Sequence, residues 1–245
     1  MHKEFKRIVG NSDKAILFVH GIVGTPNHFK DFLPYVPKDI SVYNILLDGH
    51  GKGVKDFSKT SMKKWEKQVT EAVEELEQDH KEIYIVAHSL GCLLAIEQAV
   101  CHSKVTKLFM LAVPLKLRLK PKMFINSLKV YFDKINPENK EVVAAKECYG
   151  IENEKNPFLY LGWIPRFLEL FSKIRKTRKI MGDITIPCVA CQSSNDEMVS
   201  KKARSMLENN SMISVIDLIN SGHYYYEEKD IFLMKKIFME FIYEE

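Results

Sequence analysis

Short apolar runs alternate with helical patterns along most of this chain. Six runs of four to six residues are predominantly apolar and predict buried strands. They cover residues 15–19, 42–47, 83–87, 108–113, 188–191 and 214–219. Strands without a polar face are typical of a parallel sheet that helices cover on both sides.

The segments between these runs have the period of an α-helix. Apolar side chains recur on one face of residues 62–77, opposite a face of Glu and Lys. Residues 89–100 are almost all apolar or small, which predicts a buried helix, and residues 199–207 and 231–243 predict two amphipathic helices. Strands that alternate with helices predict an α/β fold with a doubly wound, mostly parallel sheet.

One segment between two strands departs from this alternation. Residues 114–185 are far too long for a single crossover helix, and they scatter aromatic side chains among basic ones. We therefore expect residues 1–113 and 186–245 to form the core and residues 114–185 to form a helical cap inserted over one end of the sheet. So many apolar side chains must cover a surface, and the reactive end of the sheet is the available one. Removal of the cap should then change specificity more than chemistry.

The composition is that of an ordinary globular protein. Of 245 residues, 46% are hydrophobic and 28% are charged, which excludes a disordered chain. No apolar run reaches the roughly 18 residues of a membrane-spanning helix, and the N-terminal residues lack the apolar segment of a secretion signal. We therefore expect a cytoplasmic protein.

The cysteines and histidines do not indicate a metal site. Among five cysteines, Cys188 and Cys191 have C-x-x-C spacing, but they lie in a predicted strand and should point to opposite faces. Buried, reduced thiols are the expected state. Asp48 and His50 lack the clustering of a zinc site, so we expect neither a metal nor another cofactor.

Positive charge is concentrated in the cap segment. Residues 114–180 contain 15 basic and 7 acidic residues, whereas the rest of the chain contains 21 basic and 25 acidic ones. No motif that reads nucleic acid accompanies this charge, so a nucleic-acid partner is not expected. A solvated positive surface is the simplest interpretation, and weak association with anionic membrane surfaces is the more specific one.

Ser89 follows the third predicted strand and opens a helix. A sharp turn between a strand and a helix exposes a serine hydroxyl and aims the helix N-terminus at the charge formed on attack. Such a turn needs small neighbours two residues before and after the serine, and Ala87 and Gly91 fit. A serine here can also be an ordinary helix N-cap, and S-x-G alone is a weak signal.

A base and an acid follow the last two predicted strands. His223 comes after the final strand and has the near-neutral pKa that a general base needs, although His20 and His50 lie in loops at the same sheet edge and remain rivals. Asp196 follows the preceding strand and could orient an imidazole, whereas Glu197 and Asp183 are less well placed.

The loop after the first predicted strand can supply a backbone hydrogen-bond donor near Ser89. Gly21 allows a tight turn, so that the N–H of Ile22 can point toward Ser89. With the N–H of Leu90, it would form a two-donor oxyanion hole. Serine, acid and base also occur in the chain order expected of one fold that hosts this constellation.

These features resemble the α/β-hydrolase family over essentially the whole chain. The resemblance rests on His20-Gly21, on Leu47-Asp48-Gly49-His50-Gly51, and on Ser89, Asp196 and His223. It is closer to the bacterial carboxylesterases and monoacylglycerol-lipase-like enzymes with a small helical cap. The resemblance implies Ser89 as the nucleophile, Asp196 as the acid, His223 as the base, and Ile22 and Leu90 as the oxyanion donors.

Two positions depart from the family pattern. Ala87 replaces the first glycine of G-x-S-x-G, and its methyl group should fit the turn. Cys92 replaces a glycine that often follows, and we expect it to narrow the base of the pocket.

We therefore expect a serine hydrolase that cleaves carboxylic esters, with short to medium acyl chains or monoacylglycerol-like substrates. Its partner would be a small ester with an apolar acyl chain. Four cap side chains are expected to bind that chain: Phe124, Phe158, Trp163 and Phe167. A thioesterase or acyltransferase would use the same triad, and a C–C hydrolase, a serine peptidase or a non-catalytic binding module are further alternatives. The sequence does not indicate an oligomeric state.

Overall fold

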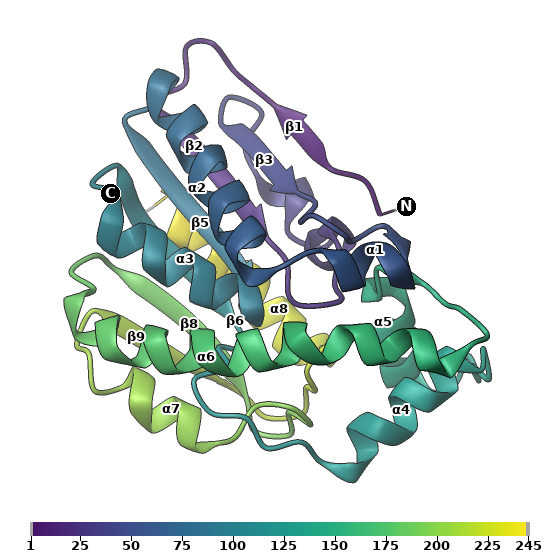
Figure 1. Cartoon of the computed structure of the whole chain (residues 1–245). Helices are drawn as coiled ribbons and strands as arrows, with labels where there is room; N and C mark the ends of the chain where they lie inside the picture. Colours follow the sequence, from purple (N-terminus) through teal and green to yellow (C-terminus); the bar gives the residue numbers. More distant parts are fainter. Residues whose placement is uncertain (1, 244–245) are drawn as a thin grey trace.

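A seven-stranded sheet forms the centre of the molecule, in the order β1-β3-β2-β5-β6-β8-β9 (Figure 1). The computed structural model describes residues 2–243. The strands of this sheet are β1 (Phe5–Arg7), β2 (Lys14–Val19), β3 (Ser41–Ile45), β5 (Glu82–His88), β6 (Val105–Leu111), β8 (Cys188–Ser193) and β9 (Ile213–Leu218). All neighbours are parallel except β1 and β3, which confirms the predicted mostly parallel α/β sheet.

The edge strand β1 was not expected from the sequence. It has only three residues and pairs antiparallel with β3, from Phe5 opposite Asn44 to Arg7 opposite Val42. Its side chains are largely exposed, so no apolar run marks it. The other six strands coincide with the six apolar runs, with ends shifted by at most three residues.

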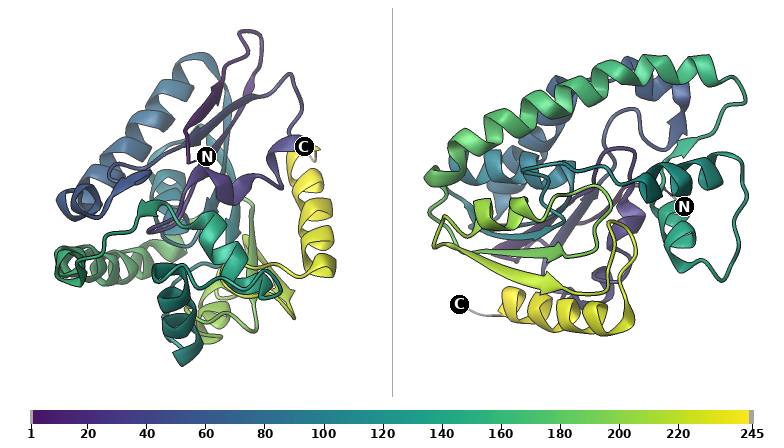
Figure 2. Two further views of the ribbon diagram at one scale, coloured as in Figure 1. Left: turned by 90° about the vertical axis from the view of Figure 1, so that its right-hand side faces the viewer. Right: turned by 90° about the horizontal axis from the view of Figure 1, so that it is seen from below.

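Two apolar layers cover the two faces of the sheet, and alternate side chains of each strand point into opposite layers. In β2, Leu17 packs into one layer with Trp65 of α2, whereas Phe18 packs into the other with Phe29 and Phe238. This is the period of two that an extended strand imposes. Figure 2 shows α8 (Glu228–Tyr243) on the side of the sheet opposite α6 (Ile164–Ile180).

The helices agree with the predicted periodicity outside the cap segment. They are α1 (Val54–Lys59), α2 (Met62–Asp79), α3 (Leu90–Cys101), α7 (Lys202–Leu207) and α8 (Glu228–Tyr243). The short α1 was not expected, and α7 begins three residues later than predicted because Val199 instead forms a bridge with Leu117. Among residues 2–243, no helix is long and apolar enough to cross a membrane.

The segment expected to form a cap is helical and reaches beyond one edge of the sheet. It contains α4 (Pro121–Tyr131), α5 (Lys140–Cys148), β7 (Ile151–Glu152), a 3₁₀ turn at Pro157–Trp163, and α6 (Ile164–Ile180). The short strand β7 pairs with β4 (Lys52–Gly53), which ties this segment to the loop after β3. Figure 1 shows α4 and α5 grouped beside one end of the long α6.

The second half of α6 packs into the core itself. Leu170 and Ile174 are buried in the same apolar cluster as α2 and α3. Between them, the buried ammonium of Lys173 contacts Glu66 of α2 at 2.9 Å and also pairs with Glu97 of α3. The helix is therefore held to the core by both apolar packing and ion pairs.

The cysteines are all free. Cys188 and Cys191 lie in opposite apolar layers, as a strand requires. Four cysteines are buried, but Cys101 at the end of α3 is exposed, so the expectation of a buried thiol is wrong there.

Candidate active site

Ser89 lies in a strained turn between β5 and α3. Its backbone has φ of 51° and ψ of −118°, in the left-handed half of conformational space that side chains other than glycine rarely adopt. Strained residues of this kind persist only when the surrounding structure imposes them, and they concentrate at functional sites. The turn places the Ser89 hydroxyl at the carboxyl edge of the sheet, beside the N-terminus of α3.

Gly91 explains why this turn tolerates so little bulk. A Cβ atom at Gly91 would lie 2.0 Å from the carbonyl oxygen of Val19, so the first turn of α3 packs directly against the backbone of β2. Two residues before Ser89, Ala87 is fully buried in the main apolar cluster. The requirement for small residues on both sides of Ser89 thus has a packing cause.

Three predicted site residues from three separate loops meet at this edge. The Nε2 atom of His223 lies 3.2 Å from the Oγ atom of Ser89, and its Nδ1 atom lies 2.8 Å from Oδ2 of Asp196. A carboxylate can only accept, so Nδ1 carries the proton and Nε2 is free to accept from the serine hydroxyl. The structure therefore joins Ser89, His223 and Asp196 in one chain of hydrogen bonds.

Asp196 is held in its ionised form. Its Oδ1 atom accepts the backbone N–H groups of Met198 and Val199, both at 2.7 Å. Burial alone would raise the pKa of Asp196, but the charge and hydrogen bond of His223, together with these N–H groups, lower it below its ordinary value. Asp196 therefore contacts both the backbone of its own loop and the ring of His223.

His223 is held in place by two carboxylates. Its backbone N–H donates to Oε2 of Glu197 at 3.0 Å, in addition to the bond from its ring to Asp196. Burial lowers the pKa of His223, but the attraction of Asp196, the hydrogen bond between them and the charge of Glu197 outweigh it and raise the pKa above its ordinary value. No sequence signal indicated the contact between Glu197 and the backbone.

The loop that follows β2 approaches Ser89 closely. A Cβ atom at Gly21 would lie 3.0 Å from the Cβ atom of Ser89, so the lack of a side chain permits this approach. Val23 has φ of 53°, a second strained residue, and Ile22 and Ser89 line the same cavity. Within residues 2–243, the backbone N–H groups of Ile22 and Leu90 donate to no protein acceptor, so both are available to a ligand.

The two rival histidines hold the loops together. The Nε2 atom of His20 accepts the backbone N–H of Leu47 at 3.1 Å, and Nδ1 of His50 donates to the carbonyl of Leu47 at 3.1 Å. Burial lowers the pKa of His20 well below its ordinary value and that of His50 to about 4. Both imidazoles are therefore neutral, and neither contacts Ser89.

His88 contacts the backbone of His223 and packs against His28. Its Nε2 atom donates to the backbone carbonyl of His223 at 3.0 Å, and its ring stacks on that of His28, with centroids 3.7 Å apart. Burial lowers the pKa of both rings, that of His28 to about 3. The polar contact of His88 is therefore with the backbone of His223 and not with Ser89.

A cavity of about 600 Å³ opens above Ser89 and His223. Three of the four expected acyl-binding side chains, Phe124, Trp163 and Phe167, line it, together with other apolar residues of α4 and α6. Phe158 does not line the cavity and is 75% exposed. Cys92 does not line it either, because its thiol is buried against the carbonyl of Leu111, so it does not narrow the pocket.

Polar groups are few in this cavity. Besides Ser89, His223 and several tyrosines, the polar residues on a wall that is otherwise aromatic and aliphatic are Asn126, Ser127, Asn153 and Glu197. Across residues 2–243, no group of three or more His, Cys, Asp or Glu side chains is arranged to hold a metal ion.

Comparisons with known proteins agree with this architecture. A structure from work on LipS and LipT, two metagenome-derived lipolytic enzymes, has 16% identity and a TM-score of 0.73, covering 98% of this chain and 97% of its own. The monoacylglycerol lipase of Paleococcus ferrophilus has 16% identity and a TM-score of 0.69, covering 98% of each chain. Est1E of Butyrivibrio proteoclasticus, bound to ferulic acid, has 14% identity and a TM-score of 0.66, covering 98% of this chain and 95% of its own.

At these identities the structural similarity establishes the fold. No curated protein matches the sequence. The sequence model of the alpha/beta hydrolase family, however, matches residues 16–231, which include Ser89, Asp196 and His223. The chain therefore belongs to the alpha/beta hydrolase family.

Proposed function

We propose that this protein hydrolyses carboxylic esters that carry an apolar acyl chain, through a covalent acyl-enzyme. The observation that carries the proposal is the hydrogen-bonded chain from Ser89 through His223 to Asp196, whose Ser89 end faces a largely apolar cavity. Ester hydrolysis needs an activated hydroxyl, a base and donors for an oxyanion, and each requirement has a matching group here.

The reaction begins when Ser89 Oγ attacks the ester carbonyl carbon and its proton passes to His223 Nε2. The N–H groups of Ile22 and Leu90 stabilise the negative charge that develops on the carbonyl oxygen. Asp196 stabilises the resulting imidazolium without taking its proton. His223 then protonates the leaving alcohol, and the C–O bond to the alcohol breaks.

Water completes the cycle. His223 accepts a proton from a water molecule as the water oxygen attacks the acyl carbonyl, and the same proton returns to Ser89 Oγ when the acid leaves. Residues of the cap segment 114–185 bind the acyl chain, with Phe124, Trp163 and Phe167 on the cavity wall. A cavity of about 600 Å³ supports short to medium acyl chains or monoacylglycerol-like esters.

The similar structures agree with this assignment, because they include lipolytic enzymes and a monoacylglycerol lipase. The compartment is a separate proposal: five free cysteines support a reducing one such as the cytoplasm.

Labelling with a fluorophosphonate probe tests the nucleophile directly. The native protein should label, and Ser89→Ala should not. Ser127→Ala removes another hydroxyl from the wall of the same cavity and should label normally, so it serves as the matched control. A native protein that does not label would refute the proposal and favour a binding module.

A substrate panel tests the reaction class. Nitrophenyl esters, acyl thioesters and aminoacyl amides should be compared by kcat/KM, with alcohol acceptors added in a parallel series. We expect the esters to be cleaved best. A clear preference for thioesters, amides or transfer to an alcohol would replace ester hydrolysis with a thioesterase, peptidase or acyltransferase activity.

A further inference from the structure

Exposed apolar side chains are concentrated on the cap segment. Of the twenty large hydrophobic side chains that are exposed within residues 2–243, eleven lie between residues 119 and 171. We call these eleven the apolar rim: Leu119, Phe124, Ile125, Leu128, Phe132, Phe158, Leu161, Ile164, Phe167, Leu168 and Phe171. A patch of this kind usually marks an interaction surface.

The apolar rim is continuous with the candidate active site. Five of its exposed members also line the cavity above Ser89: Leu119, Phe124, Leu128, Phe167 and Phe171. The other six lie outside the cavity. An acyl chain could therefore pass from the outer surface to Ser89 without leaving apolar contact.

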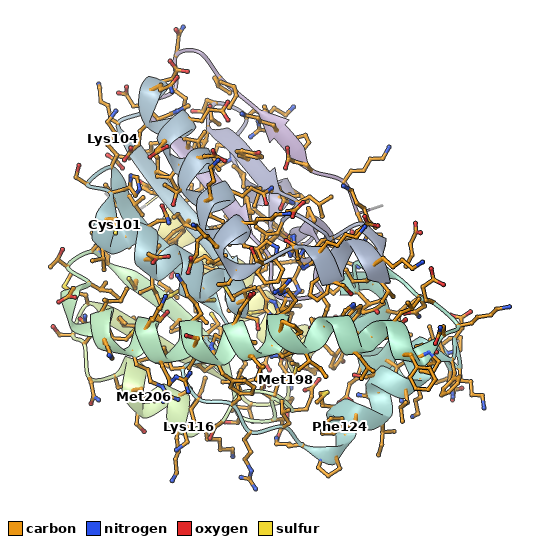
Figure 3. The ribbon with its side chains drawn as sticks, in the orientation of Figure 1. Cys101, Lys104, Lys116, Phe124, Met198 and Met206 are labelled. Atoms are coloured by element: carbon orange, nitrogen blue, oxygen red, sulfur yellow. The ribbon has the colours of Figure 1, made fainter. Side chains whose placement is uncertain are left out.

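Basic side chains accompany the apolar rim. Lys116 and Arg118 lie just before α4, and Arg175 and Lys176 lie one turn beyond Phe171 on α6; all four are exposed. None of the four forms an ion pair within residues 2–243. Figure 3 shows Lys116 and Phe124 along the same edge of the molecule, below α6. An apolar surface with free positive charge complements a layer of acyl chains beneath anionic headgroups.

The apolar rim rests on a fixed support. The indole N–H of Trp163 donates to the carbonyl of Val54 at 3.2 Å, and Arg166 donates to the carbonyl of Ser58 at 3.1 Å. Further along α6, Lys173 is paired with Glu66 and Glu97. These contacts hold α6 on the core, so the members of the apolar rim on α6 are exposed for docking without an opening of the cap.

We propose that the apolar rim docks on anionic lipid surfaces and takes the acyl chain of its substrate directly from them. This rests on the proposed ester hydrolysis for its second half only, because docking itself needs no turnover. The surface acts by raising the local concentration of the ester at the cavity mouth. Because the surface only raises this local concentration, lipid without substrate should leave the hydrolysis of a water-soluble ester unchanged.

Vesicle co-sedimentation of the full chain tests the docking step. Vesicles of phosphatidylcholine alone should be compared with vesicles that also contain phosphatidylglycerol, at low and high salt. We expect at least tenfold stronger binding to the anionic vesicles, and loss of that preference at high salt. Equal binding to both kinds of vesicle, or to neither, would overturn the proposal.

Paired variants locate the docking surface. Ile125→Ser with Leu168→Ser removes two exposed members of the apolar rim that do not line the cavity, and it should weaken vesicle binding at least tenfold. Phe232→Ser is the matched control, because Phe232 is 74% exposed on α8, across the sheet from α6 (Figure 2). Lys116→Glu with Arg175→Glu should abolish the preference for anionic vesicles. Equal effects of the paired and control variants would refute the assigned surface.

Turnover separates docking from the proposed chemistry. The Ile125→Ser, Leu168→Ser variant should keep its rate on a short soluble ester and lose rate only on an ester embedded in anionic vesicles. If no ester is cleaved while the native protein still binds vesicles, the proposed function fails and the docking surface stands. If the variant instead converts a dimer to a monomer in sedimentation velocity and leaves vesicle binding intact, the apolar rim is a contact between two copies of this chain.

Discussion

Ser89, Asp196 and His223 are at most 6% exposed, whereas the cap segment leaves Phe158 75% and Leu168 62% exposed. In the first region, every polar side chain has a directed partner, and its position is set by strand ends that belong to one sheet. In the second, exposed apolar side chains such as these contribute contact area rather than directed bonds, and they lie on helices outside the sheet. Changes in the first region should therefore act on the chemical step, and changes in the second on which ester is chosen.

The largest expected effect is the loss of the nucleophile. Ser89→Ala should lower kcat by about 10⁴–10⁶-fold, and adding His223→Ala should cost little more, because residues that act as one unit do not contribute additively. Steady-state kinetics on one nitrophenyl ester measures both. Losses that multiply in the double variant would show that the two residues act independently.

Removal of the orienting charge should be nearly as severe. Asp196→Asn is expected to lower kcat by about 10⁴-fold, because an amide in this place favours the wrong imidazole tautomer. Glu197→Gln is the matched control, since Glu197 contacts only the backbone N–H of His223 and not its ring. If the Glu197 variant were inactive and the Asp196 variant active, the assignment of Asp196 as the carboxylate that orients His223 would be wrong.

The cap region should give smaller and selective effects. With esters of two to twelve acyl carbons, kcat/KM should rise by roughly fourfold for each carbon until the cavity is full, because burying a methylene contributes about 0.8 kcal/mol. Phe167→Ala and Trp163→Ala should flatten this profile. Phe158→Ala should leave it unchanged, because Phe158 lies outside the cavity. A profile unaffected by either cavity variant would remove the cap from substrate selection.

The smallest expected effect is a shift in pH dependence. Activity requires neutral His223, so kcat/KM should rise with pH through the raised pKa of His223. Glu197→Gln removes a negative charge that stabilises the imidazolium, which lowers this pKa and moves the acid limb to lower pH while the plateau rate is retained. A limb that moves to higher pH, or a plateau that falls with no shift, would contradict this role of Glu197.

The same contrast explains what could be predicted from the sequence. Buried strands are continuous apolar runs, and the carboxyl ends of parallel strands meet at one edge, so residues as distant as Ser89 and His223 could be expected to lie close together. The choice of His223 over His20 and His50 rests on chain order and the family resemblance. The edge strand Phe5–Arg7 was not predicted because it is short and exposed. The contact between Glu197 and His223 was not predicted because it involves the backbone N–H of His223, and residue types do not reveal backbone contacts.

Aromatic residues of the cap segment were harder to place than the residues at strand ends. Phe158 and Trp163 are five residues apart in one apolar stretch, yet the first is exposed and the second is buried with its indole N–H on Val54. Composition shows that this segment must cover something, but not which side chain turns inward. That depends on the crossing of α6 over α2 and α3, which is a tertiary property.

That crossing limits how far this protein could be rebuilt by exchange of parts. α6 begins among the cavity-lining residues and ends inside the core layer, where Leu170, Lys173 and Ile174 contact the body of the molecule. A chimera that replaced all of residues 114–185 would remove the side chains that cover one side of α2 and α3. It would also leave Glu66 and Glu97 without the ammonium group of Lys173. A graft that ends before Leu170 would exchange most of the cavity-lining cap residues and keep the core contacts of Leu170, Lys173 and Ile174. The transplantable unit is therefore shorter than the insertion between the strands.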